Sequence, residues 1–167
     1  MYPLLVAAAV SLSPPEPDRL RVGAGWGLVH VALVGRDASQ ALDTRGGLVL
    51  DASYAVWRGG PVGILAGVTL LGQMFSEDGS LLAIASEHVD VELRPTGWLH
   101  LRVGVGWSEQ VGHDAYGIDA GVATRPTLFG AAGAVVWRRI GVELQVARDA
   151  FQDIELVRAG ALVTVAF

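Results

Sequence analysis

The chain has 167 residues, of which 51% are hydrophobic and only 17% are charged, and its formal net charge is −5. A soluble domain carries roughly 25% charged residues, so a soluble protein of this composition would have too little charge to cover its surface. The sequence also lacks the apolar run of about 18 residues needed for a transmembrane helix, has no cysteine for disulfides or thiolate metal sites, and its acidic balance argues against nucleic-acid binding.

The first 18 residues, MYPLLVAAAVSLSPPEPD, differ from the rest of the chain. An apolar core from Leu4 to Val10 is followed by small residues and prolines. This order resembles a secretory signal without its basic first region, which a start further upstream would supply. We therefore expect residues 1–18 to be a signal-like or disordered leader and residues 19–167 to form a single domain.

Beyond the leader, apolar β-rich segments alternate with clusters of turn-forming residues. Each segment has about 10 to 16 residues, longer than the common soluble strand of about 5 to 6 and suited to a tilted strand that crosses a bilayer. The 22 glycines of the chain argue against a helical bundle. In chain order the predicted strands are 19–34, 46–57, 61–75, 80–94, 97–108, 127–138, 140–149 and 153–167.

The connections between these segments alternate in length. The second, fourth and sixth are tight turns, at 58–61, 94–97 and 138–141. The odd-numbered connections are mostly longer, at 35–47, 76–80, 108–127 and 148–153. Short turns at one end and longer loops at the other are typical of bacterial outer-membrane barrels. The sequence therefore predicts an all-β fold, an eight-stranded antiparallel up-and-down transmembrane β-barrel.

Side chains of opposite character alternate along the predicted strands. In the fifth, Val103, Val105 and Trp107 share one face, whereas Arg102 lies on the other. Aromatic residues near the strand ends suggest two girdles at the membrane interfaces. They are Trp57, Trp98, Trp137 and Phe167 at the short-turn end, and Phe75, Trp107, Phe129 and Phe151 at the loop end. Trp57 and Trp98 have the parity of the inner face, so we place them in turns or at a slip in register.

Charged side chains gather on the predicted inner face. A barrel of eight strands is filled by its own side chains, and buried charges need partners. We expect the acids Asp51, Asp90, Glu92 and Glu143 to be matched by Arg21, Arg94, Arg102 and Arg158, with His88 and His100 between them. The lumen is thus predicted to hold a network of ion pairs.

Three motifs could carry chemistry, and each has a simpler interpretation. Ser86, His88 and Asp90 lie on one face, but such neighbours in a strand are roughly 7 Å apart, too far for a hydrogen-bond relay of about 3 Å. His113 and Asp114 fall in a loop and suggest metal ligands or a site like that of lipid-A deacylases. The His-x-Ser order of those enzymes is not matched, because Ser86-x-His88 runs in the reverse direction. We therefore expect no catalytic residue, cofactor or metal.

Glycine-rich stretches recur in two of the predicted strands. RVGAGWG (21–27) contains Gly-x-Gly-x-Gly, but a dinucleotide-binding fingerprint needs a strand before it and a helix after it. RVGVGW (102–107) repeats the same texture, which favours an architectural role on the inner face of the barrel wall.

The last segment ends in ALVTVAF, an apolar strand that finishes on Phe167. This ending resembles the assembly signal of bacterial outer-membrane barrels, and residues 19–167 are similar in pattern to the small OmpA- and OmpX-type barrels. The resemblance implies an outer-membrane location, with the lipid bilayer and the barrel-assembly machinery as partners of the chain, the latter through the last strand. We expect a monomer that does not bind nucleic acid.

Several functions and one other fold remain open from the sequence. The expected role is structural or in surface interaction, with the loops 35–47 and 108–127 facing outwards. The alternatives are a narrow pore for small solutes and a lipid-A-modifying membrane enzyme. The competing fold is a soluble β-barrel or sandwich of the lipocalin type, which would place its apolar faces inside and its charges outside.

Overall fold

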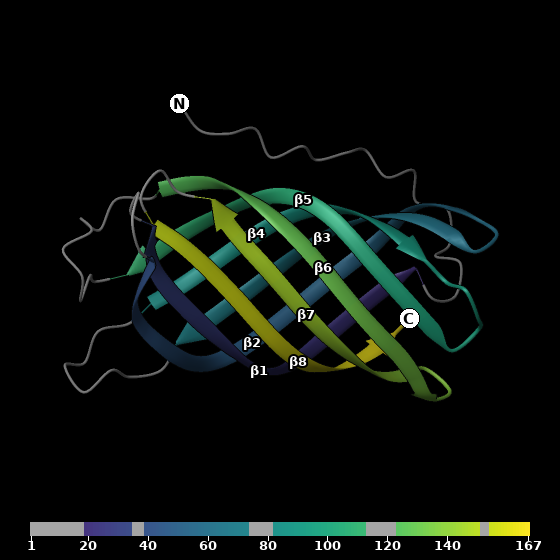
Figure 1. The fold of residues 1–167 in the computed structure, drawn as a ribbon. Coiled ribbons are helices and arrows are strands. Elements are labelled where there is room, and N and C mark those ends of the chain that lie inside the picture. Colours follow the sequence, from purple (N-terminus) through teal and green to yellow (C-terminus); the bar gives the residue numbers. More distant parts are fainter. Residues whose placement is uncertain (1–18, 35–38, 74–81, 113–122, 151–153) are drawn as a thin grey trace.

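The computed structural model is a closed barrel of eight antiparallel strands, each paired with its neighbours in sequence (Figure 1). It describes residues 19–34, 39–73, 82–112, 123–150 and 154–167. The strands are β1 (Leu20–Val34), β2 (Ser39–Gly59), β3 (Val62–Gln73), β4 (Leu82–Leu93), β5 (Leu99–Gly112), β6 (Ala123–Trp137), β7 (Ile140–Ala150) and β8 (Ile154–Ala166). The described part of the chain contains no helix long and apolar enough to cross a membrane. The predicted fold class is confirmed.

Closure of the barrel depends on the pairing of β8 with β1. Their register runs from Arg21 opposite Ala166 to Leu33 opposite Ile154. Phe167 then continues the pairing beyond β8, because its amide donates to the carbonyl of Leu20 at 2.7 Å. The apolar last strand therefore has no unpaired edge, which removes the aggregation hazard that such a strand would otherwise present.

The strands extend further at the loop end than the sequence predicted. β2 already begins at Ser39, β5 continues to Gly112 and β6 begins at Ala123, so the loops predicted at 35–47 and 108–127 were too long. Backbone hydrogen bonds between neighbouring strands continue after the apolar alternation has ended. Between β1 and β2 they continue beyond an irregularity in register between Val31 and Ala32. Hydrophobic pattern alone marks the part of a strand that faces an apolar environment.

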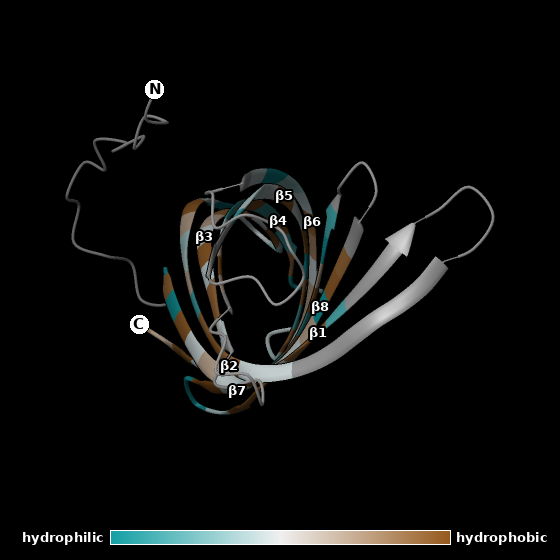
Figure 2. Cartoon of the chain, turned by 90° about the vertical axis from the view of Figure 1, so that its left-hand side faces the viewer, coloured by the Kyte–Doolittle hydropathy of each residue, from teal (hydrophilic) through white to brown (hydrophobic). Residues whose placement is uncertain are grey.

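The outer surface is apolar, and the hydropathy colouring of Figure 2 shows bands of opposite character alternating along the strands. Val103 is 70% exposed and Val105 62%, whereas Arg102, which directly precedes Val103, is buried. Large outward side chains of this kind occur on every strand. This surface is the inverse of a soluble barrel and is typical of a transmembrane one, so the lipocalin alternative is excluded.

Aromatic side chains mark both ends of this apolar surface. Trp57, Trp98 and Trp137 are exposed at the short-turn end and Trp107 at the loop end, as predicted. A bulge between Ala55 and Trp57 turns the tryptophan outwards, and Trp98 precedes β5, which accounts for their unexpected parity.

Two other aromatic predictions need comment. Phe129 was predicted to lie in the girdle, and this is wrong, because it is only 5% exposed and its ring stacks on His88 inside the barrel. The parity of β6 places it inwards. Phe167, the fourth predicted girdle residue at the short-turn end, is 53% exposed, and Phe75 and Phe151 lie outside the described residues.

Glycines allow the strands to approach closely in both glycine-rich stretches. A Cβ atom at Gly25 would collide with the carbonyl oxygen of Ala161, and one at Gly106 with that of Glu87. Both obstacles are backbone atoms of the adjacent strand, which cannot move aside as a side chain can. These contacts support the predicted architectural role of the two stretches.

Candidate functional site

The interior of the barrel holds the charged residues that the sequence predicted there, and Arg102 on β5 lies at their centre. Its Nη2 is 2.7 Å from Oδ2 of Asp90 on β4, its Nη1 is 3.0 Å from Oε1 of Glu143 on β7, and the same nitrogen is 3.5 Å from Oδ1 of Asp51 on β2. The Arg102 side chain and its three partners are fully buried. One guanidinium thus links four strands of the wall.

A second group of charges lies nearer the short-turn end. Arg21 on β1 joins Glu92 at 2.5 Å and Glu143 at 3.2 Å. Nε2 of His100 is 2.7 Å from the same Oε2 atom of Glu143. Arg94 also donates to Glu92, through Nε at 2.9 Å. The predicted pairing of buried acids with arginines is present, with Glu143 connecting this group to Arg102.

His88 and Asp90 are closer than the sequence analysis allowed. Nδ1 of His88 is 2.9 Å from Oδ1 of Asp90, although the expected separation of roughly 7 Å between neighbours on a strand face seemed to prevent contact. That separation applies to backbone positions, and the two side chains lean towards each other. Ser86 is bonded differently, because its Oγ accepts a hydrogen bond of 2.7 Å from Nη1 of Arg158.

The second nitrogen of His88 faces Thr69 on β3 rather than Ser86. Nε2 lies 3.1 Å from Oγ1 of Thr69, and that hydroxyl donates its proton to Oδ2 of Asp51 at 2.8 Å. The Thr69 hydroxyl therefore gives its proton to Asp51, whereas in a nucleophile–base pair the histidine would have to accept it. These residues form a hydrogen-bonded network and not a nucleophile–base pair.

A third cluster lies around Arg158 on β8, and of its members the sequence predicted only Arg158 as a lumen charge. Nη2 of Arg158 is 2.8 Å from Oδ1 of Asp149, and Thr127 donates to the same oxygen. Asp149 is only 1% exposed, but it lies where the predicted strand 140–149 overlaps the predicted connection 148–153 and was not among the acids predicted to face inwards. The alternation Glu143, Gln145, Ala147 continues to Asp149 and could have identified it as an inner-face residue.

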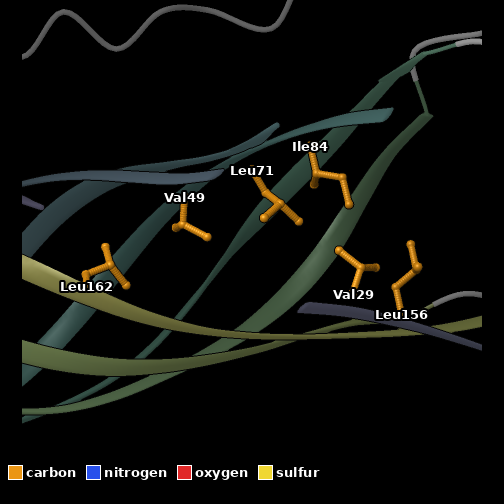
Figure 3. Close-up of a cluster of buried hydrophobic side chains, with 6 residues drawn as sticks. All are labelled: Val29, Val49, Leu71, Ile84, Leu156 and Leu162. Atoms are coloured by element: carbon orange, nitrogen blue, oxygen red, sulfur yellow. The ribbon is translucent and has the colours of Figure 1, made fainter. Parts of the chain in front are cut away.

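A cluster of apolar side chains lines the part of the lumen nearer the loop end. They come from β1, β2, β3, β4 and β8 and are all buried (Figure 3). They are Val29, Val49, Leu71, Ile84, Leu156 and Leu162. A cavity of about 30 Å³ lies between this apolar cluster and the charged residues, lined by His88, Phe129 and Arg158 among others. It has room for only one or two water molecules.

Candidate metal ligands were predicted in the long loop, at His113 and Asp114. Within the described ranges, no group of three His, Cys, Asp or Glu side chains could hold a metal ion. His113 and Asp114, the candidate ligands in the long loop, lie outside those ranges. The predictions about metals and cofactors therefore stay predictions.

Comparison with known proteins supports the fold at the level of architecture. No protein-family model matches the chain, and no curated protein sequence matches it. Among solved structures, the attachment invasion locus protein Ail of Yersinia pestis superposes with a TM-score of 0.63 at 12% identity, over 89% of this chain and 97% of that one. Neisserial surface protein A gives 0.55 at 12% identity, over 92% and 100%. Ail in complex with the heparin analogue sucrose octasulfate also gives 0.55 at 12% identity, over 89% and 99%. The apolar outer belt, the charged interior and these likenesses together give the chain the fold of the small eight-stranded outer-membrane barrels, as predicted.

Proposed function

We propose that this protein is a non-conducting outer-membrane barrel that anchors its outer loops at the cell surface for interaction with a partner. The observation that carries the proposal is the position of Arg102, which joins carboxylates from β2, β4 and β7 across the lumen. A solute crossing the barrel would have to break these buried ion pairs. It would also have to pass the apolar cluster, where an ion loses its hydration without gaining polar contacts.

Conductance measurements test this proposal against the narrow-pore alternative. The purified protein, reconstituted in a planar bilayer, is expected to give no stable current steps, because an ion would have to pass both the ion pairs of Arg102 and the apolar cluster. A known porin added to the same bilayer serves as the positive control, and heat-modifiable gel migration verifies that the reconstituted chain is folded. Reproducible current steps from the folded chain would favour the pore.

The surface role is supported by the fold and by the names of two similar structures. One is an attachment invasion locus protein and the other a surface protein. Ail is also described in complex with a heparin analogue, but we do not extend that ligand class to this chain. In the predicted loops 76–80 and 108–127, acidic residues outnumber arginines, so these loops would repel a polyanion. A partner with a basic surface fits them better.

We further propose that the last strand acts as the signal for the barrel-assembly machinery. Phe167 is 53% exposed on the same face as Val163, at the end of the barrel that carries the short turns (Figure 1). Its side chain is thus available to a partner, whereas its backbone is engaged with Leu20. The resemblance of ALVTVAF to outer-membrane assembly signals supports this role.

The variant Phe167→Ala is expected to separate assembly from stability. It keeps the backbone pairing with Leu20, so the purified variant should refold in detergent with a loss of no more than about 1.5–3 kcal/mol in the free energy of unfolding. In cells it should accumulate unassembled in the periplasm, as measured by heat-modifiable migration of the membrane fraction. The control is Trp137→Ala, which removes another exposed aromatic at the same end. Equal assembly of the two variants would show that Phe167 is only a girdle residue.

A further inference from the structure

The short-turn mouth of the barrel contains a cavity that none of the functions above uses. Its volume is about 100 Å³, several times the roughly 10–15 Å³ that one water requires. Its walls come from the β4–β5 turn, the β6–β7 turn and the adjoining ends of β1 and β8. It therefore lies where the barrel meets the aqueous phase, next to the exposed ring of Trp98.

The charged residues that line this cavity are arginines. They are Arg21, Arg94, Arg138 and Arg139, next to His100 and Thr164, and no acidic residue is among the described residues that line it. Half of the twelve arginines of the chain lie at this end of the barrel. They are Arg19, Arg21, Arg58, Arg94, Arg138 and Arg139. Guanidinium groups held this close repel one another unless an anion lies among them.

Two buried acids behind the lining are each shared by several cations. Glu92 is shared by Arg21, Arg58 and Arg94, at 2.5, 3.4 and 2.9 Å. Glu143 is shared by Arg21, His100 and Arg102. Each of these carboxylates therefore serves three cationic or potentially cationic side chains.

The β6–β7 turn places Arg138 and Arg139 at this mouth at the expense of an unfavourable backbone conformation. Arg138 has a φ of 49°, in the left-handed region that favours glycine or asparagine. In the β2–β3 turn the corresponding conformation is taken by Gly60, with a φ of 61°. The guanidinium of Arg138 is held over the ring of Trp137, 5.1 Å from its centroid. An arginine at a glycine position suggests that its charge is needed there, since strained residues concentrate at functional sites.

We propose that the short-turn mouth is an anion-binding site for a phosphate group, with Arg94, Arg138 and Arg139 as its main donors. Guanidinium forks match the oxygens of phosphate in pairs, and the Thr164 hydroxyl supplies a neutral donor. The exposed tryptophans at this end mark the level of the lipid headgroups. The phosphate group could thus belong to a headgroup of the adjacent leaflet or to a soluble phosphate compound.

Thermal unfolding in a maltoside detergent, which carries no phosphate, tests the site. In one arm inorganic phosphate is added, with sodium chloride of equal ionic strength as the reference, and in the other a short-chain phosphatidylglycerol is added, with a short-chain diacylglycerol as the reference. Whichever source occupies the site should raise the melting temperature of the wild type above its reference. A response to lipid alone assigns a headgroup, and a response to inorganic phosphate assigns a soluble source.

The double variant Arg138→Gly/Arg139→Gln connects the response to the site. Without added anion it should be at least as stable as the wild type, because glycine accepts the left-handed conformation. Its affinity for the anion should fall by about tenfold or more, since two charge-assisted donors are lost. Arg148→Gln, on an exposed arginine at the other end of the barrel, should leave the affinity unchanged. Absence of any response in both arms, or an equal response in the double variant, would overturn the proposal.

Discussion

Replacing Arg102 with alanine is expected to lower the free energy of unfolding by roughly 3–5 kcal/mol, the cost of leaving buried charges without their partner. The side chain is fully buried and holds Asp51, Asp90 and Glu143 together. Without Arg102, each of these carboxylates loses an ion pair. Asp90 keeps its contact with His88, and Glu143 keeps its contacts with His100 and Arg21. The cavity left by the guanidinium adds to the loss.

The midpoint of urea unfolding in detergent micelles measures this effect. Arg148→Ala provides the control, because Arg148 is exposed and an exposed arginine usually contributes within about 0.5 kcal/mol. Arg102→Lys should fall between the two, since a single ammonium cannot bridge three carboxylates as a planar guanidinium does. If Arg102→Ala and Arg148→Ala unfold at the same urea concentration, the lumen carboxylates are hydrated rather than paired, and the narrow-pore alternative gains support.

Introducing arginine at Val103 is expected to cost about 2–4 kcal/mol and to block membrane assembly, as a charge at the bilayer midplane does in barrels of this kind. Val103 is 70% exposed and lies on β5 midway between the girdle residues Trp98 and Trp107. The same substitution at Leu93, at the short-turn end of β4, should cost only about 0–1 kcal/mol near the interface. The measurement is refolding yield and unfolding midpoint in lipid vesicles.

The comparison of Val103 with Leu93 tests whether the cost of an outward arginine depends on its depth in the membrane. A control is also needed for general disturbance of the strand. Gly104 faces inwards next to Val103. A serine at Gly104 is unsuitable as a control, because a Cβ atom there would meet Asp90 and the backbone of Val89. Val103→Leu is the better control for general disturbance of the site. Equal losses for arginine at positions 103 and 93 would mean that the outer belt does not face lipid.

The sequence was sufficient for the features that depend on local geometry. Side chains alternate between the two faces of any strand, so the inward position of Asp90, Arg102 and Glu143 and the outward position of Val103 could be predicted without knowledge of pairing. The order of the strands could also be predicted, because strands joined by tight turns pair with their neighbours in sequence.

Only the tertiary structure decided which of these residues meet. Contacts such as Thr69 with His88, Arg158 with Asp149, and Phe129 against His88 join strands that are not all neighbours, and they depend on register and stagger around the closed barrel. The bulge that turns Trp57 outwards and the left-handed conformation of Arg138 were also not predicted, because they depend on how each strand pairs with its neighbour across a tight turn. The two-residue repeat of a strand determines the face on which a side chain lies. It does not determine how far along the barrel axis that side chain lies relative to residues of other strands. The charged network and the cationic mouth both depend on that axial position.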